Sequence, residues 1–232
     1  MKNIRHIFFD LDNTLWDHRK NAYLTLKDIF DREGVRKKYD LLFEDFHRQY
    51  FTINENLWAK IRDGEIDKEY LRKHRFYDSF LFFGIDDMEL SMKFEDNFLD
   101  EIINYNELVP GAYELLEYLS EKDYDLHILS NGFKEVTYRK AELSGIKGYF
   151  KTILSADEIQ IRKPNPEIYE YALNNAGAVK NESIMIGDDW VADVEGALSF
   201  GIKAIFFDVF NDNYTSEQFI TIKKLDQIKA YL

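Results

Sequence analysis

Hydrophobic residues follow two different patterns along this 232-residue chain. Near the N-terminus, the apolar run Ile7, Phe8 and Phe9 leads directly into Asp10. A short run without polar alternation is typical of a strand buried on both faces of a parallel sheet. We therefore expect the first strand at residues 6–10.

The region from residue 17 to 106 has a different pattern. It is charged, rich in aromatic residues and poor in Gly and Pro. Segments 21–31 and 41–52 both place apolar residues at helical spacing. This pattern predicts a mostly helical region.

From residue 109 onward, expected strands and helices alternate. Strands are expected within 124–132, 150–158, 182–189 and 203–210, and helices at 112–122, 135–145, 166–177 and 191–201. This alternation predicts an α/β fold with a parallel sheet, to which the first strand also belongs. We therefore interpret residues 1–16 and 107–232 as a core, and residues 17–106 as a helical cap inserted into it.

Composition narrows the classes of function. Hydrophobic residues make up 45% of the chain, enough for a sizeable core, and the net charge of -13 argues against binding to a nucleic-acid polymer. The chain has no cysteine, and its five histidines show no metal-binding spacing. No apolar run is long enough to span a membrane and no signal-peptide pattern precedes the first strand, so we expect a soluble, cytoplasmic protein.

Polar residues follow the expected strands, where ligands bind in open parallel sheets. They are Asp10, Asp12, Ser130–Gly132, Lys163 and Asp188–Asp189. So many carboxylates repel one another without a cation, and oxygen ligands favour a hard divalent ion such as Mg²⁺. The lysine and the Ser-Asn-Gly loop suit a phosphate. Together these groups predict phosphoryl transfer through an aspartyl-phosphate.

Four of these segments carry a family resemblance. DLDNTL at residues 10–15 resembles the first motif, DxDxT, of the haloacid dehalogenase-like hydrolase superfamily. Ser130–Gly132 resembles its second motif, Lys163–Pro164 its third, and GDDWVAD at residues 187–193 its fourth. The motifs occur in the right order over residues 4–210. The resemblance implies a Rossmann-like core with a helical cap inserted after the first motif.

The resemblance also implies roles in catalysis. Asp10 is expected to be the nucleophile, and Asp12 the general acid that protonates the leaving oxygen and then the base that activates water. Thr14 is expected to hold the loop that carries Asp12. Lys163 and the loop Ser130, Asn131 and Gly132 are expected to bind the phosphoryl oxygens.

A Mg²⁺ site is implied as well. The expected ligands are the Asp10 carboxylate, the Asp12 backbone carbonyl and the Asp188 carboxylate. Asp193 is expected to act on metal-bound waters or on Lys163. Asp189 stands where the family often has Ser or Thr, and a turn or capping role is favoured over a metal contact.

Two further comparisons sharpen the prediction. True dehalogenases resemble this fold but lack an acid two residues after the nucleophile, so Asp12 favours phosphate esters over carbon–halogen bonds. The word IFFD returns at Ile205–Asp208, but neither a second acid nor a threonine follows at the same spacing. We therefore interpret the second copy as a core strand.

Substrate choice is expected to lie in the cap, closing over the strand ends. NENLW at residues 54–58, Gly64 and His74–Phe76 resemble noncanonical pyrimidine nucleotidases. On this hypothesis Trp58 stacks on a base, and Asn54 or Arg75 binds its edge or the sugar. The alternatives are that Trp58 belongs to the cap's own core and that Arg75 is a solvated surface charge.

The sequence thus favours a Mg²⁺-dependent phosphomonoesterase, with pyrimidine nucleoside monophosphates as the expected substrates. A sugar-phosphate phosphatase or a phosphoglucomutase-type phosphotransferase needs the same catalytic residues and stays open. A non-catalytic phosphate-binding regulatory protein is the alternative from another class. The expected partner is a small phosphorylated metabolite, without nucleic-acid polymer or membrane, and the chain is expected to be a monomer or homodimer.

Overall fold

The computed structural model describes residues 3–232, which form two compact units. Of the described residues, unit 1 consists of 3–18 and 106–232, and unit 2 of Arg19–Tyr105. Within the described residues, no helix combines the length and apolar character that a membrane crossing requires.

Unit 1 is built on a six-stranded sheet in which every neighbouring pair is parallel. The strands are β1 (His6–Phe9), β2 (Asp125–Ser130), β3 (Phe150–Ser155), β4 (Ser183–Gly187), β5 (Lys203–Phe207) and β6 (Ile220–Ile222). Their order in the sheet is β3-β2-β1-β4-β5-β6. The expected parallel α/β architecture is confirmed, and β1 lies inside the sheet between β2 and β4.

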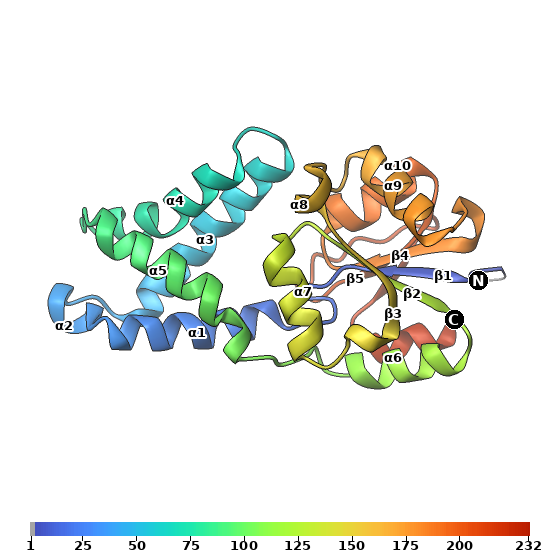
Figure 1. Cartoon of the computed structure of the whole chain (residues 1–232), viewed down its shortest axis with the longest axis horizontal. Coiled ribbons are helices and arrows are strands. Elements are labelled where there is room, and N and C mark those ends of the chain that lie inside the picture. Colours follow the sequence, from blue (N-terminus) through green and yellow to red (C-terminus); the bar gives the residue numbers. More distant parts are fainter. Residues whose placement is uncertain (1–2) are drawn as a thin grey trace. The chain divides into compact units, whose positions relative to one another are not determined.

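Helices cover both faces of this sheet, with α9 and α10 on one side and α6 on the other (Figure 1). The helices of unit 1 are α6 (Ala112–Glu121), α7 (Lys134–Leu143), α8 (Ala156–Ile159), α9 (Pro166–Ala176), α10 (Gly196–Phe200) and the short turns η2 (Lys147–Tyr149), η3 (Lys180–Glu182), η4 (Trp190–Glu195) and η5 (Leu225–Ala230). Buried side chains of the strands pack with those of α9 and α10 in one core. The unbroken apolar strand pattern follows from this burial on both faces.

Two details differ from the sequence-based expectation. The helix expected at residues 191–201 is two elements, because η4 is a π-helical turn that passes into α10 only at Gly196. The sheet also continues past the expected last strand, since β6 pairs with β5 over three residues. A strand this short at the sheet edge has too few residues for a periodic pattern.

Unit 2 is helical. It contains α1 (His18–Arg32, of which Arg19–Arg32 lies in this unit), α2 (Val35–Tyr39), α3 (Phe43–Arg62), α4 (Lys68–Leu81), α5 (Met88–Glu101) and η1 (Ile102–Asn104). Its core is aromatic: Phe46 stacks on Phe80 with ring centroids 4.7 Å apart, and Phe94 meets Phe80 edge-on at 5.0 Å.

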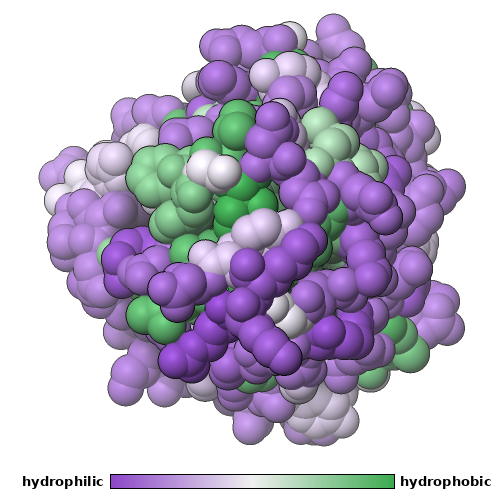
Figure 2. Space-filling view, turned by 90° about the vertical axis from the view of Figure 1, so that its left-hand side faces the viewer, coloured by the Kyte–Doolittle hydropathy of each residue, from purple (hydrophilic) through white to green (hydrophobic). Residues whose placement is uncertain are grey.

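The side of the molecule turned to the viewer in Figure 2 is mostly hydrophilic, with a smaller group of hydrophobic residues near its middle.

Candidate active site

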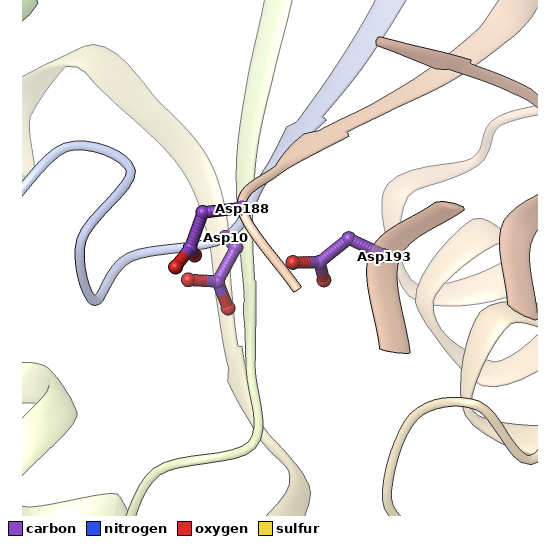
Figure 3. Close-up of side chains that lie close together, drawn as sticks. All are labelled: Asp10, Asp188 and Asp193. Atoms are coloured by element: carbon purple, nitrogen blue, oxygen red, sulfur yellow. The ribbon is translucent and has the colours of Figure 1, made fainter. Parts of the chain in front are cut away.

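The carboxyl ends of β1 and β4 bring two aspartates together. Phe9 is in register with Ile186, and Asp10 N–H donates to the Ile186 carbonyl at 2.9 Å. Asp10 and Asp188 therefore leave adjacent strands side by side, while Asp193 points toward them from η4 (Figure 3). Oxygen atoms of these three buried carboxylates lie within 4.8 Å of one another. Strands β2 and β3 lie on one side of β1 in the sheet, and β4, β5 and β6 lie on the other. Open α/β sheets bind ligands at the carboxyl ends of the strands where the strand order reverses in this way.

Lys163 connects two of these carboxylates. Its side chain is 1% exposed, and Nζ donates to Asp10 Oδ1 at 2.7 Å and to Asp193 Oδ1 at 2.6 Å. Burial acts to lower the pKa of Lys163, but the carboxylates of Asp10 and Asp193 outweigh it and raise the pKa above its usual range. Lys163 is therefore a fixed positive charge beside Asp10, and its role as a phosphate ligand stays a prediction.

The negative charge at this site exceeds what Lys163 neutralises. Burial, opposed by Lys163, raises the pKa of Asp10 to about 8. Burial and the charges of Asp10 and Asp193 raise the pKa of Asp188 well above its usual range. Thr14 Oγ1 donates to Asp188 Oδ1 at 3.1 Å. A buried set of oxygen donors that is short of positive charge fits a hard divalent cation.

Asp12 has different surroundings from the other acids. Its Oδ1 accepts a hydrogen bond from Lys140 Nζ on α7 at 2.5 Å and lies 3.8 Å from His18 Nδ1. Burial acts to raise the pKa of Asp12, but Lys140, His18 and Lys163 together hold it below its usual range. Two acids two residues apart are thus pushed toward different protonation states, with Asp12 the more strongly ionised.

The loop after β2 is held by its own side chains. Asn131 donates from Nδ2 to the Lys163 carbonyl at 2.9 Å, and its Oδ1 accepts the Lys163 N–H at 2.8 Å. Ser155 Oγ donates to the Gly132 carbonyl at 2.6 Å. Ser130, predicted to bind phosphate, is buried and accepts the Gly132 N–H at 3.0 Å. The Asn131 amide therefore joins the second and third motifs, a role that the sequence did not indicate.

The fourth motif depends on a close approach between backbone and carboxylate. A Cβ atom added to Gly187 would overlap the Asp193 carboxylate. Asp193 Oδ2 also accepts the Asp189 N–H at 3.0 Å, which fixes its orientation toward Lys163. The Asp189 side chain accepts the Ala192 N–H at 2.9 Å and caps η4. This bond accounts for Asp189 as the capping residue favoured from the sequence.

Comparison with known proteins identifies the family of this chain. The family model of haloacid dehalogenase-like hydrolases matches residues 4–201. The chain belongs to this family. It is 28% identical to the pyrimidine 5′-nucleotidase PynA of Streptococcus pneumoniae, covering 92% of this chain and 88% of that protein. It is 34% identical to the pyrophosphatase PpaX of Listeria monocytogenes, covering 81% and 76%.

Among solved structures, the magnesium-bound HAD-hydrolase YfnB of Bacillus subtilis superposes with a TM-score of 0.90. It is 24% identical, and the match covers 100% of this chain and 99% of that one. This likeness extends over both units and confirms the fold of a haloacid dehalogenase-like hydrolase.

The second IFFD segment of this hydrolase has a structural role. Asp208 is buried after β5 and accepts the backbone N–H groups of Asp212 at 2.7 Å and Asn213 at 3.2 Å. Lys223 Nζ lies 3.6 Å from its Oδ2. The carboxylate thus shapes the loop that follows its strand, whereas Asp10 directs its oxygens to a lysine and other acids.

The three residues suggested in the cap lie in different environments of unit 2. Arg75 is 3% exposed and binds Glu95 through Nε at 2.5 Å and Nη2 at 2.9 Å, with its guanidinium carbon 5.0 Å from the Phe98 ring centre. Arg75 is therefore not a solvated surface charge, and its buried ion pair favours a role inside the cap. Asn54 is 4% exposed, and among the described residues no group donates a hydrogen bond to its Oδ1. Trp58 is half-buried one turn further along α3.

Two charged residues of these sites were not anticipated from the sequence. Lys140 lies in a helix segment where a lysine is normally solvated, and nothing in its spacing marks it. Glu95 is likewise an acid inside an amphipathic helix, although it is fully buried. Both are recognised only through partners distant in sequence.

Proposed function

We propose that this hydrolase is a phosphomonoesterase that works through a phosphoryl group carried on Asp10. The observation that supports it best is the bond between Lys163 Nζ and Asp10 Oδ1, beside Asp188 and two residues before a second acid. Lys163 holds one Asp10 oxygen, so the other is the candidate nucleophile. A binding protein has no need for this pairing of a nucleophile with an acid.

In the first step, an Asp10 oxygen bonds to phosphorus as the bond from phosphorus to the ester oxygen breaks. Asp12 gives its proton to that leaving oxygen. Free Asp12 is ionised, but a phosphate dianion bound beside it raises its pKa by like-charge repulsion and favours the protonated form. Lys163 and the Ser130 loop offset the charge on the phosphoryl oxygens.

In the second step, the Asp12 carboxylate takes a proton from water. The water oxygen bonds to phosphorus and the bond from phosphorus to Asp10 breaks, which releases phosphate and regenerates the Asp10 carboxylate. Asp12 enters this step as a carboxylate because it gave up its proton in the first step. Its low pKa in the free protein then favours release of the proton taken from water.

We propose that Asp10, Asp188 and the Asp12 carbonyl hold Mg²⁺, and that Asp193 supports the site through Lys163. The ion supplies Lewis acidity at a phosphoryl oxygen when it is bound. The three crowded carboxylates fit such an ion on charge and on donor type. YfnB of Bacillus subtilis, which has the same fold, is a magnesium-bound example.

We propose pyrimidine nucleoside monophosphates as the substrates, in line with the activity named for the Streptococcus relative. In unit 2, the unpartnered Asn54 Oδ1 is a buried acceptor that suits an N–H donor of a base. Trp58, one turn away on α3, offers an aromatic face for stacking. Arg75, engaged with Glu95, is left out of the proposed contacts.

The test is phosphate release with Mg²⁺ from pyrimidine and purine 5′-monophosphates, hexose and triose phosphates, pyrophosphate and 4-nitrophenyl phosphate. We expect preference for uridine or thymidine monophosphate, and a loss of at least about 10³-fold in Asp10→Asn. Preference for sugar phosphates keeps the catalytic residues but rejects the nucleotide substrate. Absence of release from every compound, or full activity of Asp10→Asn, rejects the phosphatase.

The proposed recognition of the nucleotide base can be tested separately, with a test variant and a control variant on the same helix, α3. Asn54→Ala is expected to raise KM for uridine monophosphate about 10-fold while leaving KM for 4-nitrophenyl phosphate unchanged, because the aryl ester lacks the base. Asn56→Ala, at an exposed position two residues away, should leave both constants unchanged. Equal effects of Asn54→Ala on the two substrates would contradict recognition of the base.

A further inference from the structure

We propose that Lys140 is a positioning residue that holds the Asp12 carboxylate in the orientation needed for proton transfer. The inference rests on the proposed function and extends it, because Lys140 lies outside all four motifs. Helix α7, which carries Lys140, begins four residues after Ser130.

Burial is the first sign that Lys140 has a specific role. Its side chain is 3% exposed, although a lysine normally keeps its ammonium in water. A buried ammonium is unfavourable unless it is paired. Lys134 on the same helix shows the ordinary case, since its side chain is 53% exposed and pairs with Glu158 at the surface.

The partners of Lys140 come from the segment that carries the first motif. Nζ lies 2.5 Å from Asp12 Oδ1, 4.2 Å from the centre of the Trp16 ring and 3.4 Å from His18 Nδ1. The Trp16 face and the carboxylate together provide an environment for a buried cation. The contacts of one ammonium thus tie α7 to the loop that begins at Asp10.

The two oxygens of Asp12 are thereby distinguished. Oδ1 is held by Lys140, whereas Oδ2 lies beside Gly132, 3.6 Å from the place where a Cβ atom there would be. Gly132 belongs to the loop proposed to bind the phosphoryl oxygens. With Oδ1 fixed, Oδ2 is the oxygen left for proton exchange with the leaving group or water.

Orientation matters because proton transfer requires the donor and acceptor within hydrogen-bond reach. A displacement of about 1 Å in a reacting group can cost about 10²-fold in rate. Asp12 forms a single β-bridge with Trp16 outside the sheet, and its Oδ1 accepts the hydrogen bond from Lys140. Lys140 acts on the reaction only through Asp12.

The test compares Lys140→Met, Lys140→Arg and the matched surface control Lys134→Met. We expect Lys140→Met to lower kcat about 10- to 100-fold with either uridine monophosphate or 4-nitrophenyl phosphate. We expect kcat to fall with both substrates because the attack of water on the phosphoryl group needs Asp12 as a base. The loss in kcat/KM should be larger for uridine monophosphate, because its leaving oxygen needs a proton and nitrophenolate does not. Lys140→Arg should recover part of kcat, and Lys134→Met should behave as the wild type.

A double-mutant cycle shows whether Lys140 acts through Asp12. Lys140→Met should have little further effect in an Asp12→Asn protein, measured with 4-nitrophenyl phosphate. A full additional loss there, a raised KM with unchanged kcat, or a wild-type kcat in Lys140→Met would each overturn the proposal.

A readout without catalysis separates this inference from the proposed function. A crystal structure of Lys140→Met, or of Lys140→Gln should the first variant not fold, should show the Asp12 side chain in a different or mixed rotamer. An unchanged Asp12 rotamer overturns the positioning role even in an active enzyme. If the wild type releases phosphate from none of the compounds, the proposed phosphatase function is rejected. A displaced Asp12 side chain in the variant would still support the positioning contact with Lys140.

Discussion

At the scale of single residues, Asp188 illustrates a conflict between stability and function. Its carboxylate is buried beside Asp10 and Asp193, and burial together with these charges raises its pKa well above its usual range. Lys163 bonds to the other two acids. As the cation ligand proposed here, Asp188 is useful in its ionised form, and ionising it in the folded protein without a cation is unfavourable.

We predict that Asp188→Asn stabilises the protein in Mg²⁺-free buffer by about 1–2 kcal/mol, because it removes a buried like charge while Asn Oδ1 still accepts from Thr14. Added Mg²⁺ should raise the stability of the wild type more than that of the variant, because the folded variant has lost a proposed ligand and binds Mg²⁺ more weakly. Urea unfolding with EDTA and with Mg²⁺ measures both effects. A variant less stable than the wild type in EDTA would contradict the repulsion.

His127 gives a residue-scale prediction about pH. Burial, with a smaller effect of His6, lowers the pKa of His127 to about 4, while an unfolded histidine has a pKa of about 6.5. Between these values the unfolded state binds more protons, so stability falls as pH falls from about 6.5 toward 4. His127→Gln, which can still bond Thr152, should show a smaller loss in urea unfolding between pH 7.5 and 5. An unchanged loss would show that other groups dominate.

At the scale of elements, the junction between β4 and η4 positions the fourth motif. β4 ends at Gly187, and η4 returns Asp193 over that residue to reach Lys163. The absence of a side chain at Gly187 permits this path, since a Cβ atom would overlap the Asp193 carboxylate. The hydrogen bond that Lys163 donates to Asp193 therefore depends on the absence of a side chain at Gly187.

We predict that Gly187→Ala displaces Asp193 and destabilises the protein by about 2–4 kcal/mol, since overpacking is combined with a disturbed buried ion pair. Phosphate release should fall at least about 10-fold because Lys163 loses one of its two anchors. Gly148→Ala is the matched control: a Cβ atom there meets nothing within 4 Å. Equal stability of the two variants in thermal unfolding would argue against the close approach.

At the scale of the whole molecule, the chain forms two units with separate interiors. Unit 2 is continuous in sequence, Arg19–Tyr105, and contains an aromatic core as well as the buried pair Arg75–Glu95. Unit 1 draws its central strand from the residues before unit 2 and the remaining strands from those after it. This connectivity suggests that unit 2 folds from local contacts alone.

We predict that residues 19–105, expressed alone, form a helical protein that unfolds cooperatively, as judged by circular dichroism and by dispersed amide resonances. Glu95→Gln in this fragment should cost about 3–5 kcal/mol, because Arg75 is left as an uncompensated buried charge. Glu89→Gln is the control, on the same helix without burial. A fragment that is helical but lacks a cooperative transition would show that unit 1 completes this core.

The parts of the fold that were predictable have a local cause. Short, mostly apolar runs mark β1, β2, β4 and β5 because each of these strands is largely buried. The bounds expected for the cap, residues 17–106, lie within two residues of those of unit 2, Arg19–Tyr105. β6 was missed because three edge residues carry no period. The π-helical turn η4 was missed because its altered winding leaves the apolar spacing nearly helical.

The sequence by itself determined which acids follow which strands, because Asp10 and Asp188 each come directly after an apolar strand. Since parallel strands end at the same edge of the sheet, the two acids are expected to lie close together. Tertiary structure alone decided the pairing of charges. Lys140 meets Asp12 across 128 positions and Arg75 meets Glu95 from a neighbouring helix. A buried ion pair depends on the distance between two side chains and on their shared exclusion from water, and neither quantity has a periodic signature in the chain.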